Sequence, residues 1–283
     1  MIKPGWLKKP PVDFLATSQV RQNISLGRLN TVCHSARCPN LGECFSRGTA
    51  TFMILGDECS RSCGFCAVPH GKPAGRVDLG EPERVAQTAA RMGLSHVVVT
   101  SVTRDDLVDG GAGIFARTIW ALRREAPSAK VEVLTPDFMG NLASVDTVAG
   151  AGPDLFNHNM ETVRRLYGAV RPEGEYTRSL QVIRHVRAAY PAIRVKSGFM
   201  LGLGEEEDEV IQLMEDLKWA GCQVVTIGQY LSPSRKHLPV VEYIPPERFQ
   251  ELERIGLQIG FDDVFAGPFV RSSYMAGERG GDC

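Results

Sequence analysis

Six of the eight cysteines in this 283-residue chain fall within one short stretch, in two groups of three. The first group is Cys33, Cys38 and Cys44, and the second is Cys59, Cys63 and Cys66. Three thiolates can bind three irons of a four-iron cluster, which leaves the fourth iron without a cysteine ligand. That iron can take a substrate, a cofactor or an unusual protein ligand. The spacing therefore indicates an enzyme with two separate uses for iron and sulfur.

Two other interpretations of the cysteines fit less well. A disulfide framework requires an oxidising compartment and is typical of small scaffolds. Structural zinc has four ligands, and His34 or His70 could complete a set, but zinc sites usually bring their cysteines as close pairs. Here only Cys63 and Cys66 form a tight C-x2-C pair, so zinc is disfavoured. Iron–sulfur sites accept mixed short gaps and are favoured, whereas the isolated Cys222 is expected to be a small buried hydrophobe.

Composition predicts a sizeable globular protein of the cytoplasm. The chain is 43% hydrophobic and 23% charged, with a net charge of −1, so nothing attracts it in bulk to nucleic acid or to an anionic membrane. No apolar run approaches the roughly 20 residues of a membrane helix. The N-terminal segment lacks the apolar core of a secretory signal, so we expect no export and reduced thiols.

Downstream of the second cysteine group the sequence repeats one pattern: an amphipathic helix, a glycine, a short apolar run and a polar loop. Glycine just past a helix and followed by a β-rich run is typical of a helix C-cap that leads into a strand. Six strands are expected, near residues 51–55, 96–100, 130–134, 154–157, 193–199 and 223–228. Because they alternate with helices, the sheet should be parallel. Their continuous apolar runs indicate that both faces are covered.

The fold class that we predict is α/β, a partial (β/α)6 TIM-type barrel with extensions at both ends. The absence of a G-x-G-x-x-G motif after the first strand disfavours a dinucleotide-binding sheet. The barrel would span residues 51–231, with an N-terminal extension over 1–50 that carries the first cysteine group and a C-terminal extension over 232–283.

Polar residues gather where the predicted strands end, and the second cysteine group directly follows the first of these strands. In a barrel such ends share one mouth, where active sites lie. Solvation alone also makes loops polar, which is the simpler explanation for any one of them. Lys196 lies within a predicted strand, where an unpaired charge is costly, so we expect it to pair with Glu161 or Asp137.

The octapeptide Cys59–Cys66, CSRSCGFC, resembles the CxxxCxxC loop of the radical S-adenosylmethionine (SAM) superfamily. Residues 31–44, TVCHSARCPNLGEC, resemble the auxiliary-cluster motif of the lipoyl synthase family, and residues 267–274, GPFVRSSY, resemble its RSSY motif. Further similar segments are SVTRDDLVDGGA, FNHNMETVRRLY, KSGFMLGLGE and IGQYLSPSRKHLPV. The resemblance covers nearly the whole chain. It departs at His34-Ser35, Phe45 and Ser60, none of which removes a ligand.

The resemblance implies the insertion of two sulfurs, at carbons six and eight of an octanoyl chain on a lysine of a carrier protein. These carbons are unactivated, so a radical must abstract their hydrogens. The implied ligands of the cluster that cleaves SAM are Cys59, Cys63 and Cys66. The implied ligands of a second [4Fe–4S] cluster, the sulfur donor, are Cys33, Cys38, Cys44 and Ser273, with Ser272 as the alternative to Ser273. The implied partners are octanoylated lipoyl carrier proteins or domains, an electron donor and an iron–sulfur cluster assembly carrier.

Five further residues are candidates for binding SAM. Asn159, Glu161 and Arg171 could bond its ribose and carboxylate, since arginine suits a carboxylate, although Arg171 could equally be a solvated charge. Gly202 and Gly204 would let the backbone approach the adenosyl group or would form a tight turn. The rival interpretations are another sulfur-inserting radical enzyme, of biotin synthase or methylthiotransferase type, and a non-catalytic metal-binding scaffold.

Overall fold

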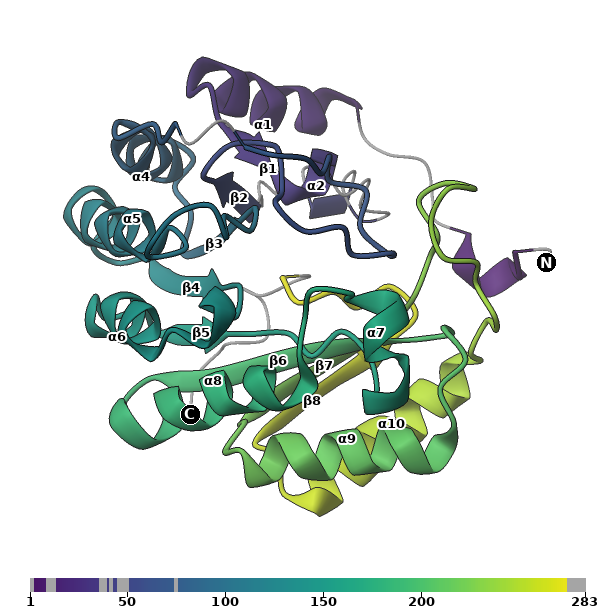
Figure 1. Ribbon diagram of the computed structural model, residues 1–283. Helices are drawn as coiled ribbons and strands as arrows, with labels where there is room; N and C mark the ends of the chain where they lie inside the picture. The colour runs from purple at the N-terminus through teal and green to yellow at the C-terminus, as the bar shows by residue number, and fades with distance from the viewer. Residues whose placement is uncertain are drawn as a thin grey trace. The chain divides into compact units, whose positions relative to one another are not determined.

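The computed structural model describes residues 3–8, 14–35, 40, 43–44, 51–73 and 76–273 (Figure 1). Its tertiary contacts divide the chain into two compact units. Unit 1 comprises Met1–Pro10, Ser62–Ala67 and Asn157–Ser272. Unit 2 comprises Pro11–Arg61, Val68–Phe156 and Ser273–Cys283. Within the described ranges, no helix combines the length and the apolar character needed to cross a membrane.

Unit 2 contains a sheet whose strands lie in chain order. The strands are β1 (Asn30–Thr31), β2 (Thr51–Ile54), β3 (His96–Ser101) and β4 (Lys130–Leu134). Strands β2, β3 and β4 are parallel, whereas β1 runs antiparallel to β2 and places Thr31 opposite Phe52. Every residue of β2 is buried, as its continuous apolar sequence predicts.

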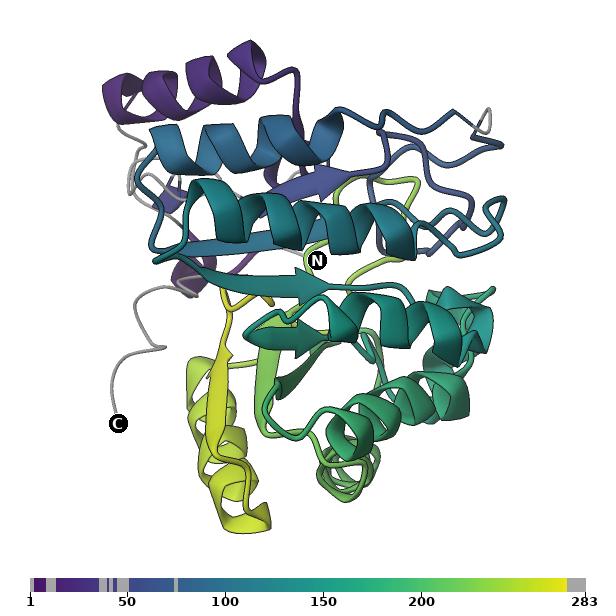
Figure 2. The same ribbon diagram turned by 90° about the vertical axis from the view of Figure 1, so that its left-hand side faces the viewer.

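The helices of unit 2 connect successive strands and cover them. They are α1 (Phe14–Leu26), α2 (Val32–Ser35), α4 (Glu81–Arg91), α5 (Ala112–Glu125) and α6 (Leu142–Gly150), with the 3-10 turn η2 (Phe138–Gly140). Helices α4 and α5 lie side by side over β2–β4 (Figures 1 and 2). In α4, Pro82 occupies the first turn and Val85 and Ala89 are fully buried, so the apolar stripe predicted from the sequence does face the sheet.

Unit 1 contains three parallel strands, β6 (Arg194–Leu201), β7 (Val224–Gln229) and β8 (Asp263–Gly267). Its longer helices are α8 (Tyr176–Ala189), α9 (Glu207–Trp219) and α10 (Pro246–Ile259). Its shorter elements are η1 (Gly5–Leu7), η3 (Arg164–Leu166) and α7 (Tyr167–Val170). A capping box formed by Glu206 and Glu209 begins α9. Strand β5 (Leu155–Asn157) spans the residue at which one unit ends and the other begins.

All six predicted strands are present, as β2 to β7, with ends within two residues of those expected. The structure adds two strands to them. Strand β8 continues the repeat, since Gly260 ends α10 with a φ of 103° and the chain then enters the sheet. Strand β1 is two residues long and therefore too short to produce a periodic pattern. The segments expected to be extensions thus contribute one strand each.

Candidate functional site

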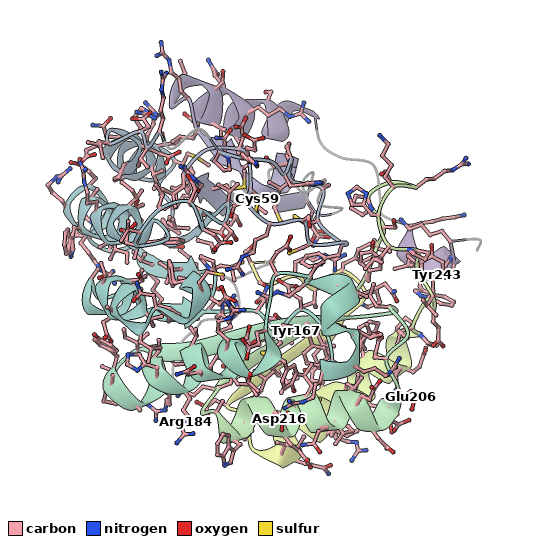
Figure 3. All side chains as sticks on the ribbon, viewed as in Figure 1. Cys59, Tyr167, Arg184, Glu206, Asp216 and Tyr243 are labelled. Carbon is pink, nitrogen blue, oxygen red and sulfur yellow. The ribbon has the colours of Figure 1, made fainter. Side chains whose placement is uncertain are left out.

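The cysteine loop follows β2, and its first ligand candidate is Cys59, which Figure 3 labels. Two backbone N–H groups donate hydrogen bonds to its sulfur. The backbone N–H of Thr103 donates to Cys59 Sγ at 3.3 Å, and that of Arg61 at 3.5 Å. The backbone of Cys59 also pairs with the segment around His70. Donated N–H groups stabilise negative charge on sulfur, which is what a cluster thiolate requires.

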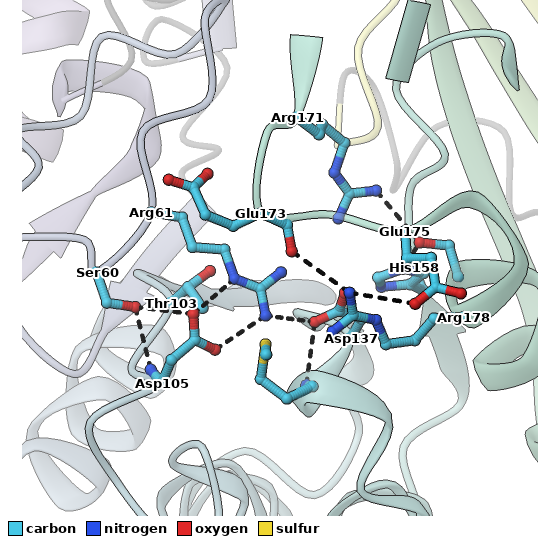
Figure 4. Close-up of polar contacts among 12 residues, drawn as sticks. Ser60, Arg61, Thr103, Asp105, Asp137, His158, Arg171, Glu173, Glu175 and Arg178 are labelled. Carbon is cyan, nitrogen blue, oxygen red and sulfur yellow. Dashed lines mark hydrogen bonds and ion pairs between the residues drawn. The ribbon is translucent and has the colours of Figure 1, made fainter. Parts of the chain in front are cut away.

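Arg61 anchors this part of the loop to the loops that follow β3 and β4 (Figure 4). Its Nε donates to Asp105 Oδ2 at 2.7 Å and its Nη2 to Asp137 Oδ1 at 2.5 Å. The side chain of Arg61 is 3% exposed and that of Asp137 is fully buried. Burial opposes the charge on Arg61, but the hydrogen bonds and charges of the two carboxylates outweigh it and raise the pKa. The sequence did not indicate a role for Arg61 or Asp105, and Asp137 was one of the two partners expected for Lys196.

Cys63 and Cys66 belong to a turn of unit 1 that is hydrogen-bonded to two other segments of the same unit. The N–H of Cys66 donates to the carbonyl of Cys63 at 3.1 Å, and the N–H of Gly64 donates to the carbonyl of Val170 at 3.0 Å. From the other side, His237 Nε2 lies 3.1 Å from the carbonyl of Cys66. In the sequence, His237 stood out only as part of the family-like segment IGQYLSPSRKHLPV. Its contact with Cys66 could not be predicted, because the two residues lie 171 positions apart.

The second cysteine group supplies three thiols as possible ligands. Cys59, Cys63 and Cys66 are thiols, and each is partly exposed. Within the described ranges, no three histidine, cysteine or acidic side chains are grouped to hold one metal ion. In a cluster each thiolate binds a different iron, so its sulfurs stand further apart than those around zinc.

The first cysteine group is only partly described. Cys33 is buried in α2, and the N–H of Cys44, which is partly buried, donates to the carbonyl of Asn40 at 2.9 Å. Cys38 lies outside the described residues. Two cysteines of the predicted set are therefore located, both in unit 2.

The two neighbouring serines have different partners. Ser273 Oγ accepts a hydrogen bond from Thr51 Oγ1 at 2.8 Å, and Thr51 is the first residue of β2. The next residue of β2, Phe52, lies opposite Thr31, two positions before Cys33. Ser272 Oγ lies instead beside the side-chain amide of Asn159. The structure thus distinguishes two residues between which the sequence left a choice.

Three of the SAM candidates form one hydrogen-bonded set in unit 1, in which Asn159 and Arg171 are buried and Glu161 is partly buried. Asn159 Nδ2 donates to Glu161 Oε1 at 2.9 Å, and Arg171 Nη1 donates to the carbonyl of Asn159 at 2.9 Å and to the hydroxyl of Tyr167 at 2.7 Å. Burial raises the pKa of Glu161, while Arg171 and Arg271 act in the opposite direction. Arg171 is 8% exposed, so it is not a solvated surface charge.

The glycine candidates form a tight turn at the end of β6. Gly202 and Gly204 have φ values of 100° and 101°, in the left-handed region that favours glycine. A Cβ on Gly202 would lie 2.3 Å from Gln229 Nε2 and 2.4 Å from the carbonyl of Glu242. The N–H groups of this turn donate to the Glu205 carboxylate. The sequence allowed two interpretations of these glycines, a tight turn or a close approach to the adenosyl group. The structure shows the tight turn.

Two other residues singled out in the sequence are buried. Cys222 is fully buried, as expected, and its Sγ donates to the carbonyl of Val224 at 3.2 Å. Burial raises the pKa of this thiol to about 12, so it stays protonated. Lys196 is 4% exposed, and its Nζ donates to the carbonyl of Ser272 at 2.5 Å, a partner that the sequence did not indicate.

Comparison with known proteins places this arrangement in a class. The family model of the radical SAM superfamily matches residues 53–217. Among solved structures, methylornithine synthase (PylB) has a TM-score of 0.56 at 15% identity, covering 92% of this chain and 84% of its own. Streptococcus suis SuiB bound to S-adenosylmethionine has a TM-score of 0.56 at 11% identity, covering 94% of this chain and 60% of that one. The chain therefore belongs to the radical SAM superfamily, and its α/β fold is the partial barrel predicted from the sequence.

Curated relatives narrow the class further. A lipoyl synthase of Rubrobacter xylanophilus is 52% identical over 277 residues, covering 98% of this chain and 86% of the relative. A lipoyl synthase of Caldanaerobacter subterraneus subsp. tengcongensis is 55% identical, covering 97% of this chain and 95% of the relative. A mitochondrial lipoyl synthase of Nematostella vectensis is 50% identical, covering 97% of this chain and 94% of the relative. The chain belongs to the lipoyl synthase family. It is a sulfur-inserting enzyme that uses a [4Fe–4S] cluster and SAM and acts on an octanoylated carrier protein.

Proposed function

We propose that the two cysteine groups bind two separate [4Fe–4S] clusters with different duties in this reaction. Cys59, Cys63 and Cys66 hold the cluster that binds SAM. The backbone N–H groups that meet Cys59 Sγ at 3.3 and 3.5 Å support this role, because they favour a thiolate ligand. When bound, the cluster and SAM supply the radical that abstracts hydrogen from an unactivated carbon.

The auxiliary cluster, which donates the sulfur, is held by Cys33, Cys38, Cys44 and Ser273. The observation that carries this assignment is the Thr51–Ser273 hydrogen bond of 2.8 Å, between residues 222 positions apart. It brings the C-terminal serine to the start of β2, beside the strand that leads into Cys33. A serine ligand suits a sacrificial cluster, because hard oxygen matches iron–sulfur less well than thiolate does and that iron is lost more readily.

The residues that contact SAM are Asn159, Glu161, Arg171, Gly202 and Gly204. Asn159, Arg171 and Gly202 are buried and the other two are partly buried, which supports a site with little access to water, as a reactive radical requires. Arg171 also donates a hydrogen bond to the carbonyl of Asn159 at 2.9 Å, which helps to fix Asn159 in the site. In the turn at Gly202, the absence of a Cβ lets the side chain of Gln229 and the carbonyl of Glu242 approach the end of β6 closely.

The remaining assignments follow from the chemistry. Reductive cleavage of SAM needs an electron donor, and a consumed cluster needs an iron–sulfur assembly carrier to restore it. Reduced thiols fit a cytoplasmic location. By function, residues 1–50 carry the auxiliary motif, 51–231 form the radical SAM barrel and 232–283 bring the serine.

The test is an anaerobic incubation of the reconstituted enzyme with SAM, a reductant and an octanoylated lysyl peptide. Mass spectrometry should show two sulfurs gained by the peptide, together with cleaved SAM. Cys59→Ala should abolish both products, whereas Cys33→Ala should abolish the sulfur gain and leave SAM cleavage. A wild-type enzyme with intact clusters and no sulfur gain would falsify the proposal.

A further inference from the structure

Ser272 is held from two sides by residues of unit 1. Its Oγ lies 2.7 Å from Asn159 Nδ2 and 3.0 Å from Asn159 Oδ1, so the hydroxyl meets both ends of the amide. Its backbone carbonyl accepts a hydrogen bond from Lys196 Nζ at 2.5 Å. We call Asn159, Lys196 and Ser272 the serine clamp.

Two of the three clamp residues are buried and Ser272 is partly buried, which makes the contacts of the clamp costly to break. Lys196 is 4% exposed and Asn159 is 9% exposed. A buried ammonium or amide group that loses a partner forfeits its hydrogen bond without regaining water. Gly198 of β6 suits this close packing, since a Cβ there would collide with Thr226 Oγ1 and would lie 3.2 Å from both Ser272 Oγ and Asn159 Oδ1.

The two serines differ in how tightly their hydroxyls are held. The hydroxyl of Ser272 and the carbonyl that follows it are engaged by an amide and by a cation. The hydroxyl of Ser273 meets the neutral hydroxyl of Thr51, a partner that a metal can displace more readily than it can displace a buried amide. Ser272 is therefore suited to fix the backbone, whereas Ser273 is suited to exchange its hydrogen bond with Thr51 for a bond to a metal.

We propose that Ser272 is a positioning residue, clamped by Asn159 and Lys196 so that Ser273 presents its hydroxyl to the auxiliary cluster. This inference rests on the proposed function, in which Ser273 is the ligand. Clamping the preceding residue restricts the Ser272–Ser273 peptide and so lowers the entropic cost of placing the Ser273 hydroxyl on iron.

The experiment uses the full chain with both clusters reconstituted from isotope-labelled iron. Three variants are compared with wild type: Ser272→Ala, which removes the hydroxyl of the clamp; Ser273→Ala, which removes the ligand; and Ser197→Ala, a control. Ser197 is a buried serine of β6 whose hydroxyl donates to the carbonyl of His158 at 2.8 Å. Asn159 is left intact because it also contacts Glu161.

The readouts are the rate at which a chelator removes iron without substrate, the Mössbauer spectrum that identifies the affected cluster, and the melting temperature. Ser272→Ala should lose one auxiliary iron roughly fivefold faster than wild type, the effect of about one hydrogen bond. Ser273→Ala should lose that iron during reconstitution. Ser197→Ala should lower the melting temperature without accelerating iron loss, which separates positioning from general destabilisation.

Each of the other outcomes overturns either the clamp or the assignment of Ser273 as the ligand. If Ser273→Ala loses iron and Ser272→Ala matches wild type, the clamp fails while the ligand assignment stands. If neither variant loses iron faster, Ser273 is not the ligand, and the proposed function itself is wrong on this point. If Ser272→Ala alone loses the iron, Ser272 is the ligand and the inference is overturned.

Discussion

Burial perturbs the protonation of two carboxyl groups, Glu81 and Glu161, at the scale of single residues. Removal from water raises the pKa of each of them. Glu81 accepts the N–H of Leu55 at 2.8 Å and lies in unit 2, whereas Glu161 accepts from Asn159 in unit 1. Burial thus raises the pKa of both carboxyl groups, but their hydrogen-bond partners differ. Of the two, only Glu161 is a candidate for binding SAM.

Replacing Glu161 by glutamine should stabilise the apoprotein and weaken SAM binding. Because the folded-state pKa exceeds the ordinary value of 4.5, the folded protein holds the proton more tightly, and stability falls as pH rises from 4.5 through the raised pKa. The variant lacks this loss, so its gain in melting temperature should grow over that window and vanish below it. Thermal melts at several pH values and SAM titrations measure the two effects.

Glu81→Gln is the matched control for this change. It should show the same sign of stability gain, because burial raises the pKa of Glu81 as well. Its SAM affinity should remain that of wild type. Equal SAM affinities in the two variants would remove Glu161 from the cofactor site.

At the scale of elements, the first part of the cysteine loop is anchored by ion pairs to loops that follow neighbouring strands. Arg61 ties it to Asp105 after β3 and to Asp137 after β4. Asp137 also caps η2 by accepting the N–H of Met139 at 3.1 Å. One guanidinium therefore links three loops at the ends of parallel strands, where the side chains that do the chemistry gather.

Arg61→Ala should lower the free energy of unfolding by about 3–5 kcal/mol, because it removes a buried cation that is hydrogen-bonded to the fully buried carboxylate of Asp137. Chemical denaturation of the apoprotein measures this loss. Arg84→Ala, in the same unit, breaks a pair with Asp78 whose side chains are 31% and 59% exposed, and should cost about 1 kcal/mol or less. Similar losses for both variants would mean that burial does not strengthen the Arg61 anchor.

At the scale of the whole molecule, the function depends on ligands brought together from distant parts of the chain. The described members of the auxiliary set, Cys33, Cys44 and Ser273, all belong to unit 2 although the serine comes from the C-terminal end. The radical SAM set is instead local, since its three cysteines lie within eight consecutive residues. The two clusters should therefore form independently of one another.

Iron analysis of the reconstituted protein tests this independence. Wild type should contain about eight irons per chain, and Cys33→Ala and Cys59→Ala should each retain about four, with the absorbance of a [4Fe–4S] cluster. Loss of all iron in either variant would show that one cluster depends on the other. Stoichiometric zinc in the wild-type protein purified from cells would contradict the iron–sulfur assignment.

The features that the sequence by itself determined are local ones. Apolar runs located six strands because a strand buried on both faces must be apolar throughout. Cysteine spacing indicated the cluster loop because its three ligands are near neighbours along the chain. The family resemblance rested on the same kind of contiguous motif, and comparison with relatives confirmed it.

Only the tertiary structure decided which partners these residues have. It distinguished Ser272, beside Asn159, from Ser273, beside Thr51. It gave Lys196 a backbone carbonyl as a partner and buried Arg171 in a polar network. The physical reason is that a hydrogen bond depends on the positions of two groups within about 3 Å, and packing sets those positions between segments that lie far apart in the sequence.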